Sequence, residues 1–400
     1  MPAPYYLVNR RDFDFLLSAE GQQLLAETAA AGLTPDSHLQ LAMRLREQVG
    51  AARAAAVLET VTLRQRAAAK FSHAGQMYFE RAALEQASAE VVATYRAARY
   101  GRLGVRWVAD LGCGLGGDAL ELAAHSHVVG VDLVALRLAM ARENLRAYGL
   151  DGRFHPLQAD LLTLPPLPVE AVFADPARRD ERGHRLFSVH DYRPPLGYLD
   201  RWRERVANVG VKISPAVDYA ELPAAAEVEF ISVQGELREG VLWYGDLRTA
   251  AARRATLLPG GHTLTAESGA VAVAVTPVQN YLIEPDAAVI RAHLVQQLAA
   301  QLGATKIDET IAFLTAPTPP VTPLARTYAV EAAFPFQLKR LRAYLRERQI
   351  GHLIIKKRGS PLEVEALRRQ LRLQGPGERV LVLTQVGGVA TAVIARSYAS

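Results

Sequence analysis

The sequence predicts an α/β protein whose central part is a parallel sheet flanked by helices, between an N-terminal helical domain and a small C-terminal α/β domain. Three observations support this prediction. Short apolar runs alternate with amphipathic stretches in the middle of the chain, a glycine-rich turn follows the first run, and a proline cluster precedes a second series of strand-like runs. Strands that alternate with helices predict a parallel sheet with helices on both faces.

Length and composition set the broad class. The chain has 400 residues, which at roughly 100–200 residues per domain indicates two or three domains. Half of the residues are hydrophobic and 22% are charged, as in a soluble globular protein. No apolar run reaches the roughly 18 uncharged residues of a membrane span, and the N-terminus lacks the pattern of a secretion signal. We therefore expect a cytoplasmic enzyme without a membrane anchor.

The cysteine and histidine content argues against a metal site. Cys113 is the single cysteine, which excludes an intrachain disulfide and any multi-cysteine metal site. The histidines, among them His125, His127 and His184, lack metal-ligand spacing. We expect no bound metal.

Residues 1–100 read as a helical domain. They are rich in Ala, Leu, Arg, Glu and Gln, and they contain no proline between Asp36 and Arg99. From Phe79 to Tyr100 the apolar residues recur at the spacing of three and four that an amphipathic helix shows.

Residues 101–275 contain the alternating elements. Helices are expected at about 119–126 and 135–148. A hairpin around a Gln-Gly-Glu turn is expected over 228–245. The expected strands are WVADLG from Trp107, 128–132, 154–160, 169–175 and 209–214.

The C-terminal part divides at a proline cluster. Residues 276–323 are interpreted as a linker region because they contain six prolines, four of them between Pro317 and Pro323. Residues 324–400 then restart with two strand–helix pairs and two final strands. This last module has 14 Lys and Arg against 5 Asp and Glu, a net charge of +9, which leaves −4 for the remainder. Such an imbalance suggests an anionic partner such as RNA. A solvated Arg-rich surface without a partner is an equally good interpretation.

The main chemical signal is DLGCGLGGD, residues 110–118. Gly112, Gly114 and Gly116 let the backbone turn tightly and approach a ligand, and the following helix offers its N-terminal N–H groups to an anionic part of that ligand. Glycine turns of this kind occur in NAD enzymes as well. The acidic Asp110, two residues before the first glycine, favours S-adenosylmethionine.

Further carboxylates end the strands that follow. Asp132 lies 18 residues beyond Gly114, where a carboxylate can accept hydrogen bonds from ribose hydroxyls. Asp160 ends the third strand, and Asp175-Pro176 ends the fourth. Each one alone is better explained as a helix cap or loop residue. Together they mark four successive strand ends, where open α/β sheets bind ligands.

These segments resemble a known family. DLGCGLGGD, GVDLVALRLAMARENL, QADLL and FADPARR resemble the class I S-adenosylmethionine-dependent methyltransferases, which have a Rossmann-like sheet, and the glycine segment is similar to that of the trimethylguanosine-synthase-like branch. The whole chain is similar to bacterial methyltransferases with a C-terminal THUMP-like domain. The segments that carry this wider resemblance are KFSHAGQMYF, DPARRDERGHRLF, VKISPAVDY, GELREGVLWYG, YLIEPDAAVIRAHLV and LIIKKRG.

The resemblance implies S-adenosylmethionine as cofactor and a role for each motif residue. The glycine segment holds the methionine part, the second strand end the ribose, the third the adenine, and the fourth lines the acceptor pocket. The implied cofactor residues are Asp110, Gly112, Cys113, Gly114, Gly116, Asp132, Leu133 and Asp160, and the implied catalytic residues are Asp175 and Pro176.

The acceptor motif departs from the family pattern. Enzymes that methylate amino groups usually have Asn/Asp-Pro-Pro and an aromatic residue, whereas this chain has Asp-Pro-Ala-Arg. Phe187, Tyr192 or Trp243 is expected to supply stacking instead. Methylation of a pyrimidine carbon is set aside because it uses a cysteine nucleophile, and Cys113 lies inside the cofactor loop.

Two basic groups are candidates for RNA binding. Arg178 and Arg179 follow the Asp-Pro pair, and Lys356, Lys357 and Arg358 end a strand of the basic module. Either group can contact phosphates, or it can be a solvated surface. We expect RNA methylation at a base nitrogen, in tRNA or rRNA. The alternatives are a methyltransferase for a small molecule or protein, and an RNA-binding protein that binds the cofactor without catalysis.

Overall fold

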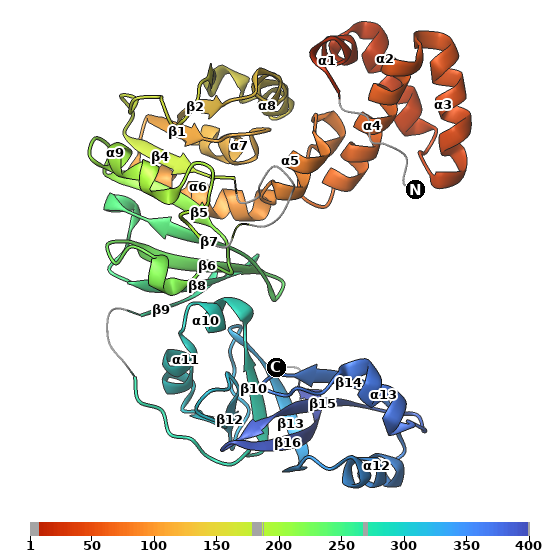
Figure 1. The fold of residues 1–400 in the computed structure, drawn as a ribbon, viewed down its shortest axis with the longest axis vertical. Coiled ribbons are helices and arrows are strands. Elements are labelled where there is room, and N and C mark those ends of the chain that lie inside the picture. Colours follow the sequence, from red (N-terminus) through yellow and green to blue (C-terminus); the bar gives the residue numbers. More distant parts are fainter. Residues whose placement is uncertain (1–7, 178–185, 187, 267–270, 399–400) are drawn as a thin grey trace. The chain divides into compact units, whose positions relative to one another are not determined.

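The computed structural model describes residues 8–177, 186, 188–266 and 271–398 (Figure 1). The chain forms two compact units. The first comprises Met1–Ala226 and Val241–Thr249, and the second comprises Glu227–Gly240 and Ala250–Ser400. The strand β7 (Glu236–Trp243) therefore begins in the second unit and ends in the first.

The first unit begins with helices whose starts are fixed by capping side chains. Asn9, Ser18 and Thr34 each accept a hydrogen bond from a main-chain N–H three residues further on, which satisfies one of the unpaired donors of a helix start. No helix in the described ranges has both the length and the apolar character that crossing a membrane requires. The helices are α1 (Arg10–Leu17), α2 (Ala19–Ala30), α3 (Pro35–Val49), α4 (Ala51–Ala67), α5 (Arg81–Gln86) and α6 (Glu90–Leu103).

Five parallel strands form the rest of the first unit, in the order β3-β2-β1-β4-β5, and β7 follows β5 in the same nine-stranded sheet. This order confirms the predicted Rossmann-like sheet. Leu111 pairs with both Val131 and Ala174, so Gly112, Asp132 and Asp175 follow at the same level of the sheet. The elements are β1 (Trp107–Leu111), α7 (Gly117–Ala123), β2 (His127–Asp132), α8 (Ala135–Ala147), β3 (Phe154–Gln158), β4 (Ala171–Ala174), α9 (Asp200–Arg203) and β5 (Asn208–Ile213).

The expected hairpin is present as β6 (Glu227–Val233) and β7. Its two-residue turn uses Gln234 at φ 53° and Gly235 at φ 84°, and left-handed backbone at both positions is what a type I′ turn requires. β8 (Arg253–Leu258) pairs in parallel with β6, and β9 (His262–Ala266) pairs antiparallel with β8. These last two strands had no counterpart in the sequence prediction.

A second sheet of seven strands completes the second unit, in the order β11-β12-β10-β13-β16-β15-β14. Residues 276–323, interpreted from the sequence as a linker region, contribute three of these strands and two helices. Pro285 is the last residue of β10 and Pro317 follows β12, so these prolines lie at strand ends, where they remove no ladder hydrogen bond. The elements are β10 (Tyr281–Pro285), α10 (Ala287–Arg291), α11 (Val295–Leu302), β11 (Thr305–Lys306), β12 (Leu314–Ala316), β13 (Ala325–Pro335), α12 (Leu338–Glu347), β14 (Ile350–Lys357), α13 (Val364–Leu371), β15 (Gly377–Val386) and β16 (Val389–Tyr398).

Both faces of this second sheet are covered. Along β15, Leu381 and Leu383 pack with residues of α12 and α13, while the alternate residues Val380 and Val382 join a cluster with Phe313. This alternation is the period of two that a strand imposes. The clusters explain why the strands of this module read as nearly continuous apolar runs.

Candidate cofactor and acceptor site

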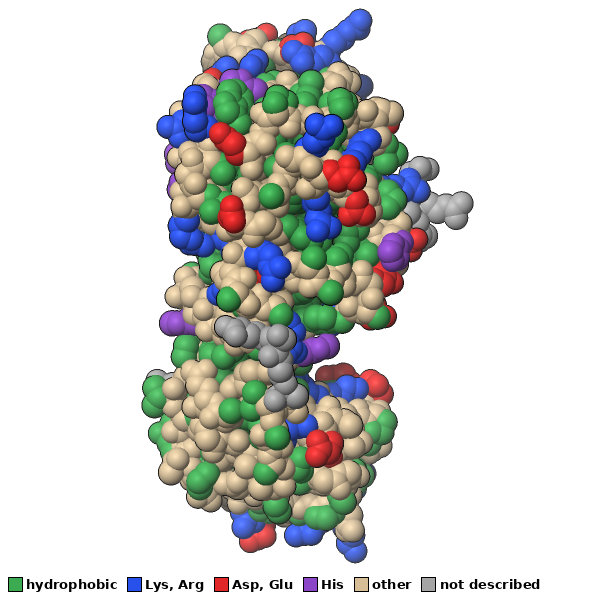
Figure 2. Space-filling model, turned by 90° about the vertical axis from the view of Figure 1, so that its left-hand side faces the viewer, with side chains coloured by type: hydrophobic (Ala, Val, Ile, Leu, Met, Phe, Trp, Pro, Cys, Tyr) green, Lys and Arg blue, Asp and Glu red, His purple; other side chains and the backbone are tan. Residues whose placement is uncertain are grey.

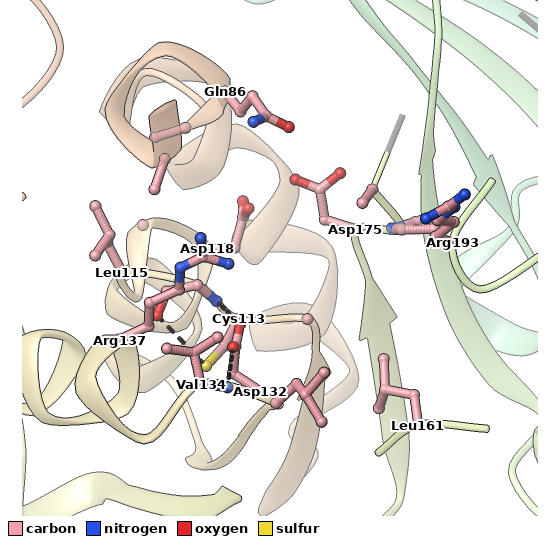
Figure 3. Close-up of a pocket in the computed structure, with 18 of the residues that line it drawn as sticks. Gln86, Cys113, Leu115, Asp118, Asp132, Val134, Arg137, Leu161, Asp175 and Arg193 are labelled. Atoms are coloured by element: carbon pink, nitrogen blue, oxygen red, sulfur yellow. Dashed lines mark hydrogen bonds between the residues drawn. The ribbon is translucent and has the colours of Figure 1, made fainter. Parts of the chain in front are cut away.

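A cavity of about 590 Å³ lies at the carboxyl ends of β1, β2 and β4, within the first unit (Figure 3). Pockets for small molecules span roughly 300–1,000 Å³. The wall is formed by the glycine turn, the segments after the strand ends, residues 71–88 of the N-terminal domain, Arg137 of α8, and residues 193–195. The structure thus brings together most of the motif residues that the sequence singled out.

Main-chain hydrogen bonds hold the glycine turn. The N–H groups of Gly112 and Cys113 both donate to the Val131 carbonyl, at 2.9 and 3.0 Å. Gly112 has φ 83°, and a Cβ there would lie 3.0 Å from the Asp175 carbonyl oxygen. Only glycine combines this backbone with that close approach. The turn is therefore fixed against β2 and against the end of β4.

Gly116 has a packing role. It is absent from the cavity lining, where its neighbours Leu115 and Gly117 appear. Its φ is 80°, and a Cβ would lie 3.0 Å from side-chain carbons of Ala141 and Leu145 on α8. Gly116 thus allows α7 to start close to α8.

Asp132 lines the cavity and is almost fully buried. Its Oδ2 accepts the Gly114 N–H at 3.0 Å, and its Oδ1 accepts the Val134 N–H at 2.8 Å. Each carboxylate oxygen can accept a second hydrogen bond, so both remain capable of binding hydroxyls. The neighbouring Leu133 is 66% exposed and also lines the cavity.

Asp160 lies in the cavity wall beyond β3. Its Oδ1 accepts the Leu162 N–H at 2.9 Å, and its side chain is exposed. This carboxylate is therefore held by its own turn while facing solvent and cavity.

Asp175 follows β4, and its carboxylate and the Gln86 side chain are directed toward the same space (Figure 3). Its Oδ2 forms an ion pair with Lys212 Nζ at 2.6 Å, and the Lys212 side chain is only 3% exposed. Pro176 lies beside it in the lining. Beyond them, Ala177 and Arg193 exchange two main-chain hydrogen bonds. The predicted phosphate contacts Arg178 and Arg179, and Phe187, lie outside the described residues.

A cluster of buried charges lies behind the cavity. Arg96, 2% exposed, forms an ion pair with Asp118. Asp110 is 1% exposed, and among the described residues no group donates a hydrogen bond to either of its oxygens. Burial raises the pKa of Asp110 well above its ordinary value, and the charges of Asp118 and Asp175 raise it further, against the opposing effect of Arg96 and Lys212.

The unbonded oxygens of Asp110 fit a cofactor that has a cationic group. S-adenosylmethionine has two cationic groups, an ammonium and a sulfonium.

Residues 71–88 form a wall that the sequence analysis did not assign to the site. Phe71, Met77, Phe79 and Gln86 line the cavity. The fully buried Asn144 of α8 fastens this wall: its Oδ1 accepts the Tyr78 N–H at 2.7 Å, and its Nδ2 donates to the carbonyls of Tyr78 and Leu115. The available signal was KFSHAGQMYF, an aromatic segment that lacks helical periodicity.

Two expectations about aromatic stacking are wrong. Tyr192 and Trp243 are fully buried and do not line the cavity, and the Tyr192 hydroxyl accepts the Ser214 N–H at 2.9 Å.

Cys113 does line the cavity, but it is 7% exposed and burial raises the pKa of its thiol well above the ordinary value. A protonated, buried thiol is a poor nucleophile, which fits the exclusion of cysteine-based methylation.

The basic residues at the end of β14 separate into two groups. The Lys357 Nζ donates to the Leu362 carbonyl at 3.1 Å and pairs with Glu363 at 3.5 Å. Lys356 and Arg358, two residues apart, line a second cavity instead. On the face shown in Figure 2, Lys and Arg side chains are scattered among acidic and uncharged ones. Within the described ranges, no three His, Cys, Asp or Glu residues gather as a metal site.

Comparison with known proteins identifies the class. A methyltransferase-domain model matches residues 108–177, a THUMP domain-like model matches residues 325–397, and a domain of unknown function matches residues 9–67. The chain is 37% identical over 350 residues to an uncharacterized S-adenosylmethionine-dependent methyltransferase of two Mycobacterium tuberculosis strains, covering 84% of this chain and 94% of the relative.

The fold extends this likeness over almost the whole chain. A solved structure of a proposed methyltransferase from Porphyromonas gingivalis W83 superposes with a TM-score of 0.73 at 19% identity, covering 95% of this chain and 99% of the other. The protein is thus a class I methyltransferase by fold. It belongs to the family of S-adenosylmethionine-dependent methyltransferases that carry a C-terminal THUMP-like domain, and its cofactor is S-adenosylmethionine.

Proposed function

We propose that this enzyme methylates a base nitrogen of RNA, in tRNA or rRNA. The observation that carries the proposal is the joining of a methyltransferase domain to a THUMP-like module with a net charge of +9. A polyanion is the partner that such a module attracts. The apolar and aromatic wall formed by Phe71 and Phe79 suits a planar base as the acceptor.

In this proposal the cofactor side of the cavity is formed by residues 112–114, Asp132 and Asp160. The free N–H groups at the start of α7 would face the carboxylate of the methionine part, Asp132 would accept hydrogen bonds from the ribose, and Asp160 would lie at the adenine end. Asp110 would balance the ammonium group from behind the turn. When bound, S-adenosylmethionine supplies an electrophilic methyl group attached to a sulfonium.

Asp175 orients the acceptor. Its pairing with Lys212 at 2.6 Å holds the carboxylate in one orientation. A hydrogen bond from the exocyclic amine of a base to this carboxylate would aim the nitrogen lone pair at the methyl group. S-adenosylmethionine would supply the methyl group, with the electrons of the C–S bond left on sulfur, and Asp175 would pass the released amine proton to solvent. Alignment of this kind can contribute roughly 7–11 kcal/mol.

The test uses labelled S-adenosylmethionine and total RNA from a strain that lacks the gene. Wild type is compared with Asp175→Asn and with Asp246→Asn, a control that removes an exposed carboxylate outside the cavity. We expect label in RNA with wild type and the control, and at most about one hundredth of it with Asp175→Asn. Nucleoside mass analysis then identifies the methylated atom. No label in any RNA fraction, with cofactor binding intact, would overturn the proposal in favour of a protein or small-molecule acceptor.

A further inference from the structure

A second cavity of about 650 Å³ lies entirely within the second unit. The turn at Gln234-Gly235, the turn between β8 and β9, and the ends of β10, β13 and β14 surround it. We call it the strand-end cavity. Neither the family models nor the relatives assign a role to it.

Curling of the seven-stranded sheet creates this cavity. β14 lies four places from β10 in the strand order, and adjacent strands are about 4.8 Å apart, so a flat sheet would separate them by roughly 19 Å. Nevertheless Lys356 Nζ on β14 lies 2.5 Å from Glu284 Oε2 on β10. The sheet therefore bends until the ends of its distant strands face one another, and cations from β13 and β14 meet there.

Internal contacts already engage the two carboxylates in the cavity wall. Glu284 accepts hydrogen bonds from Lys356 and from the Tyr328 hydroxyl at 2.7 Å. Burial alone would raise the pKa of Glu284, but these two bonds outweigh it and the pKa lies below its ordinary value. Asp286 accepts the Ala288 N–H at 2.8 Å and caps α10. Neither carboxylate forms an ion pair with Arg326 or Arg358.

Two guanidinium groups complete the positive side of the cavity wall. Among the described residues neither Arg326 nor Arg358 forms an ion pair, although Glu284 acts on Arg358 from a distance and Tyr328 hydrogen-bonds Arg326. Arg358 is half-buried, and its Cζ atom lies 5.2 Å from the centroid of the Phe313 ring. Its Nη1 donates to the Ala312 carbonyl at 3.4 Å. Burial lowers its pKa, and Glu284 only partly opposes this.

The turn at Gly235 leaves room for the other guanidinium. Gly235 has φ 84°, and a Cβ there would lie 2.9 Å from Arg326 Nη2. The site therefore offers two planar forks of N–H donors, one from each side of the curled sheet. Such forks match the paired oxygens of a phosphate, and each carries a charge that a phosphate neutralises.

We propose that the strand-end cavity binds a phosphodiester group of an RNA strand through Arg326 and Arg358. This inference rests on the proposed function, since it identifies where the RNA backbone is held. Lys356 lies at the base of the site, where it is held by Glu284. Lys357, which was expected to act with its neighbours, has no part in it.

The experiment measures binding of fluorescently labelled bulk tRNA and, separately, of labelled rRNA to the full chain by anisotropy, between about 50 and 250 mM salt. Arg326→Gln/Arg358→Gln is compared with Arg340→Gln/Lys357→Gln, which removes the same two charges elsewhere in the module. We expect the first variant to bind about 10–100-fold more weakly and to lower the salt slope by about 1 per lost phosphate contact. The control should change binding less than about threefold.

Arg326→Lys/Arg358→Lys separates geometry from charge. It should keep the wild-type salt slope but lose part of the affinity, because lysine cannot bind a phosphate with a fork. Thermal unfolding of every variant checks that the fold is retained. Equal losses in the glutamine variant and the control would overturn the inference while leaving RNA as the substrate. Absence of RNA binding by wild type itself would overturn the proposed function and this inference with it.

Discussion

The two sides of the methyltransferase cavity are fixed by different means. On the cofactor side, the carboxylate of Asp132 is held by N–H groups of Gly114 and Val134, which belong to the same two strand–turn units. On the acceptor side, Asp175 is held by the Lys212 side chain, 37 residues away, and the wall at Tyr78 is held by Asn144, 66 residues away. One side depends on local main-chain geometry and the other on long-range side-chain pairs.

This difference predicts separable effects of substitution. A change on the cofactor side should lower cofactor affinity. A change of a side chain on the acceptor side should lower methyl transfer while cofactor affinity stays near wild type, because the Asp175 carboxylate pairs with Lys212 on β5. If substitutions on the two sides changed cofactor affinity and methyl transfer alike, the distinction between the two sides would be wrong.

The largest effect is expected for Asp175→Asn. The amide loses the charge that accepts the amine hydrogen bond, and we expect methyl transfer to fall by about 100-fold or more. Cofactor affinity, measured by titration calorimetry, should change less than about threefold. A comparable loss of affinity would place this residue on the cofactor side.

Loss of stability must be distinguished from loss of chemistry in that variant. Asp175→Asn leaves the buried ammonium of Lys212 without its carboxylate, which destabilises by up to about 3–5 kcal/mol in fully buried pairs. Asp175→Asn/Lys212→Met removes both charges and should recover part of the unfolding free energy without recovering activity. Recovery of activity in the double variant would show that the carboxylate acts only through stability.

Asp132→Asn should act on the cofactor side. An asparagine keeps one oxygen for a main-chain N–H, but its NH₂ group faces the other N–H donor and can accept nothing from a ribose. Loss of charge-assisted hydrogen bonds worth about 1.5–3 kcal/mol corresponds to roughly 10–100-fold weaker cofactor binding. Calorimetry measures the affinity, and turnover at saturating cofactor should stay within a few-fold of wild type.

The same contrast explains how much the sequence could predict. The glycine turn, Asp132 and Asp175 each follow a strand, and the register places the ends of these strands level. The strand ends alone were therefore enough to predict that these residues lie together. Gly116 was assigned to the cofactor because a glycine spacing cannot separate ligand approach from helix packing, and only the approach of Ala141 and Leu145 makes that distinction.

The rest depends on contacts that no local pattern records. Residues 71–88 reach the cavity because Asn144 binds their main chain, and Arg358 reaches the strand-end cavity because a whole sheet curls. Residues 276–323 were interpreted as a linker region because of their prolines, although Pro285 and Pro317 lie at the ends of short strands. Tyr192 and Trp243 were considered for stacking by residue type alone, and burial decided otherwise.

Asn144→Leu tests whether the acceptor side depends on a long-range side-chain contact, because it should lower the stability of the protein. It removes one acceptor and one donor from a fully buried position and leaves the Tyr78 N–H and two carbonyls without partners. Each buried unsatisfied group costs about 1–3 kcal/mol, so we expect a loss of at least about 2 kcal/mol in urea unfolding. Thr94→Val, which removes an exposed hydroxyl contact in α6, serves as control and should change stability by less than about 1 kcal/mol. A neutral Asn144→Leu would mean that the wall does not depend on this amide.

The smallest effect concerns the buried carboxyl of Asp110 and its dependence on pH. Burial, with the charges of Asp118 and Asp175, raises its pKa above the ordinary 3.8, so the folded protein binds this proton more tightly than the unfolded chain does. The free energy of unfolding therefore falls as pH rises from about 4 toward the folded pKa, by about 1.4 kcal/mol per unit of difference. Asp110→Asn lacks this decline and, without cofactor, should be more stable than wild type at pH 8. It should bind S-adenosylmethionine more weakly, because the charge that offsets the ammonium is gone. Urea unfolding at pH 5 and pH 8 measures the stability of the two proteins, and calorimetry measures their cofactor affinity. If their stabilities changed with pH in the same way, the pKa of Asp110 would not differ between the folded and unfolded states.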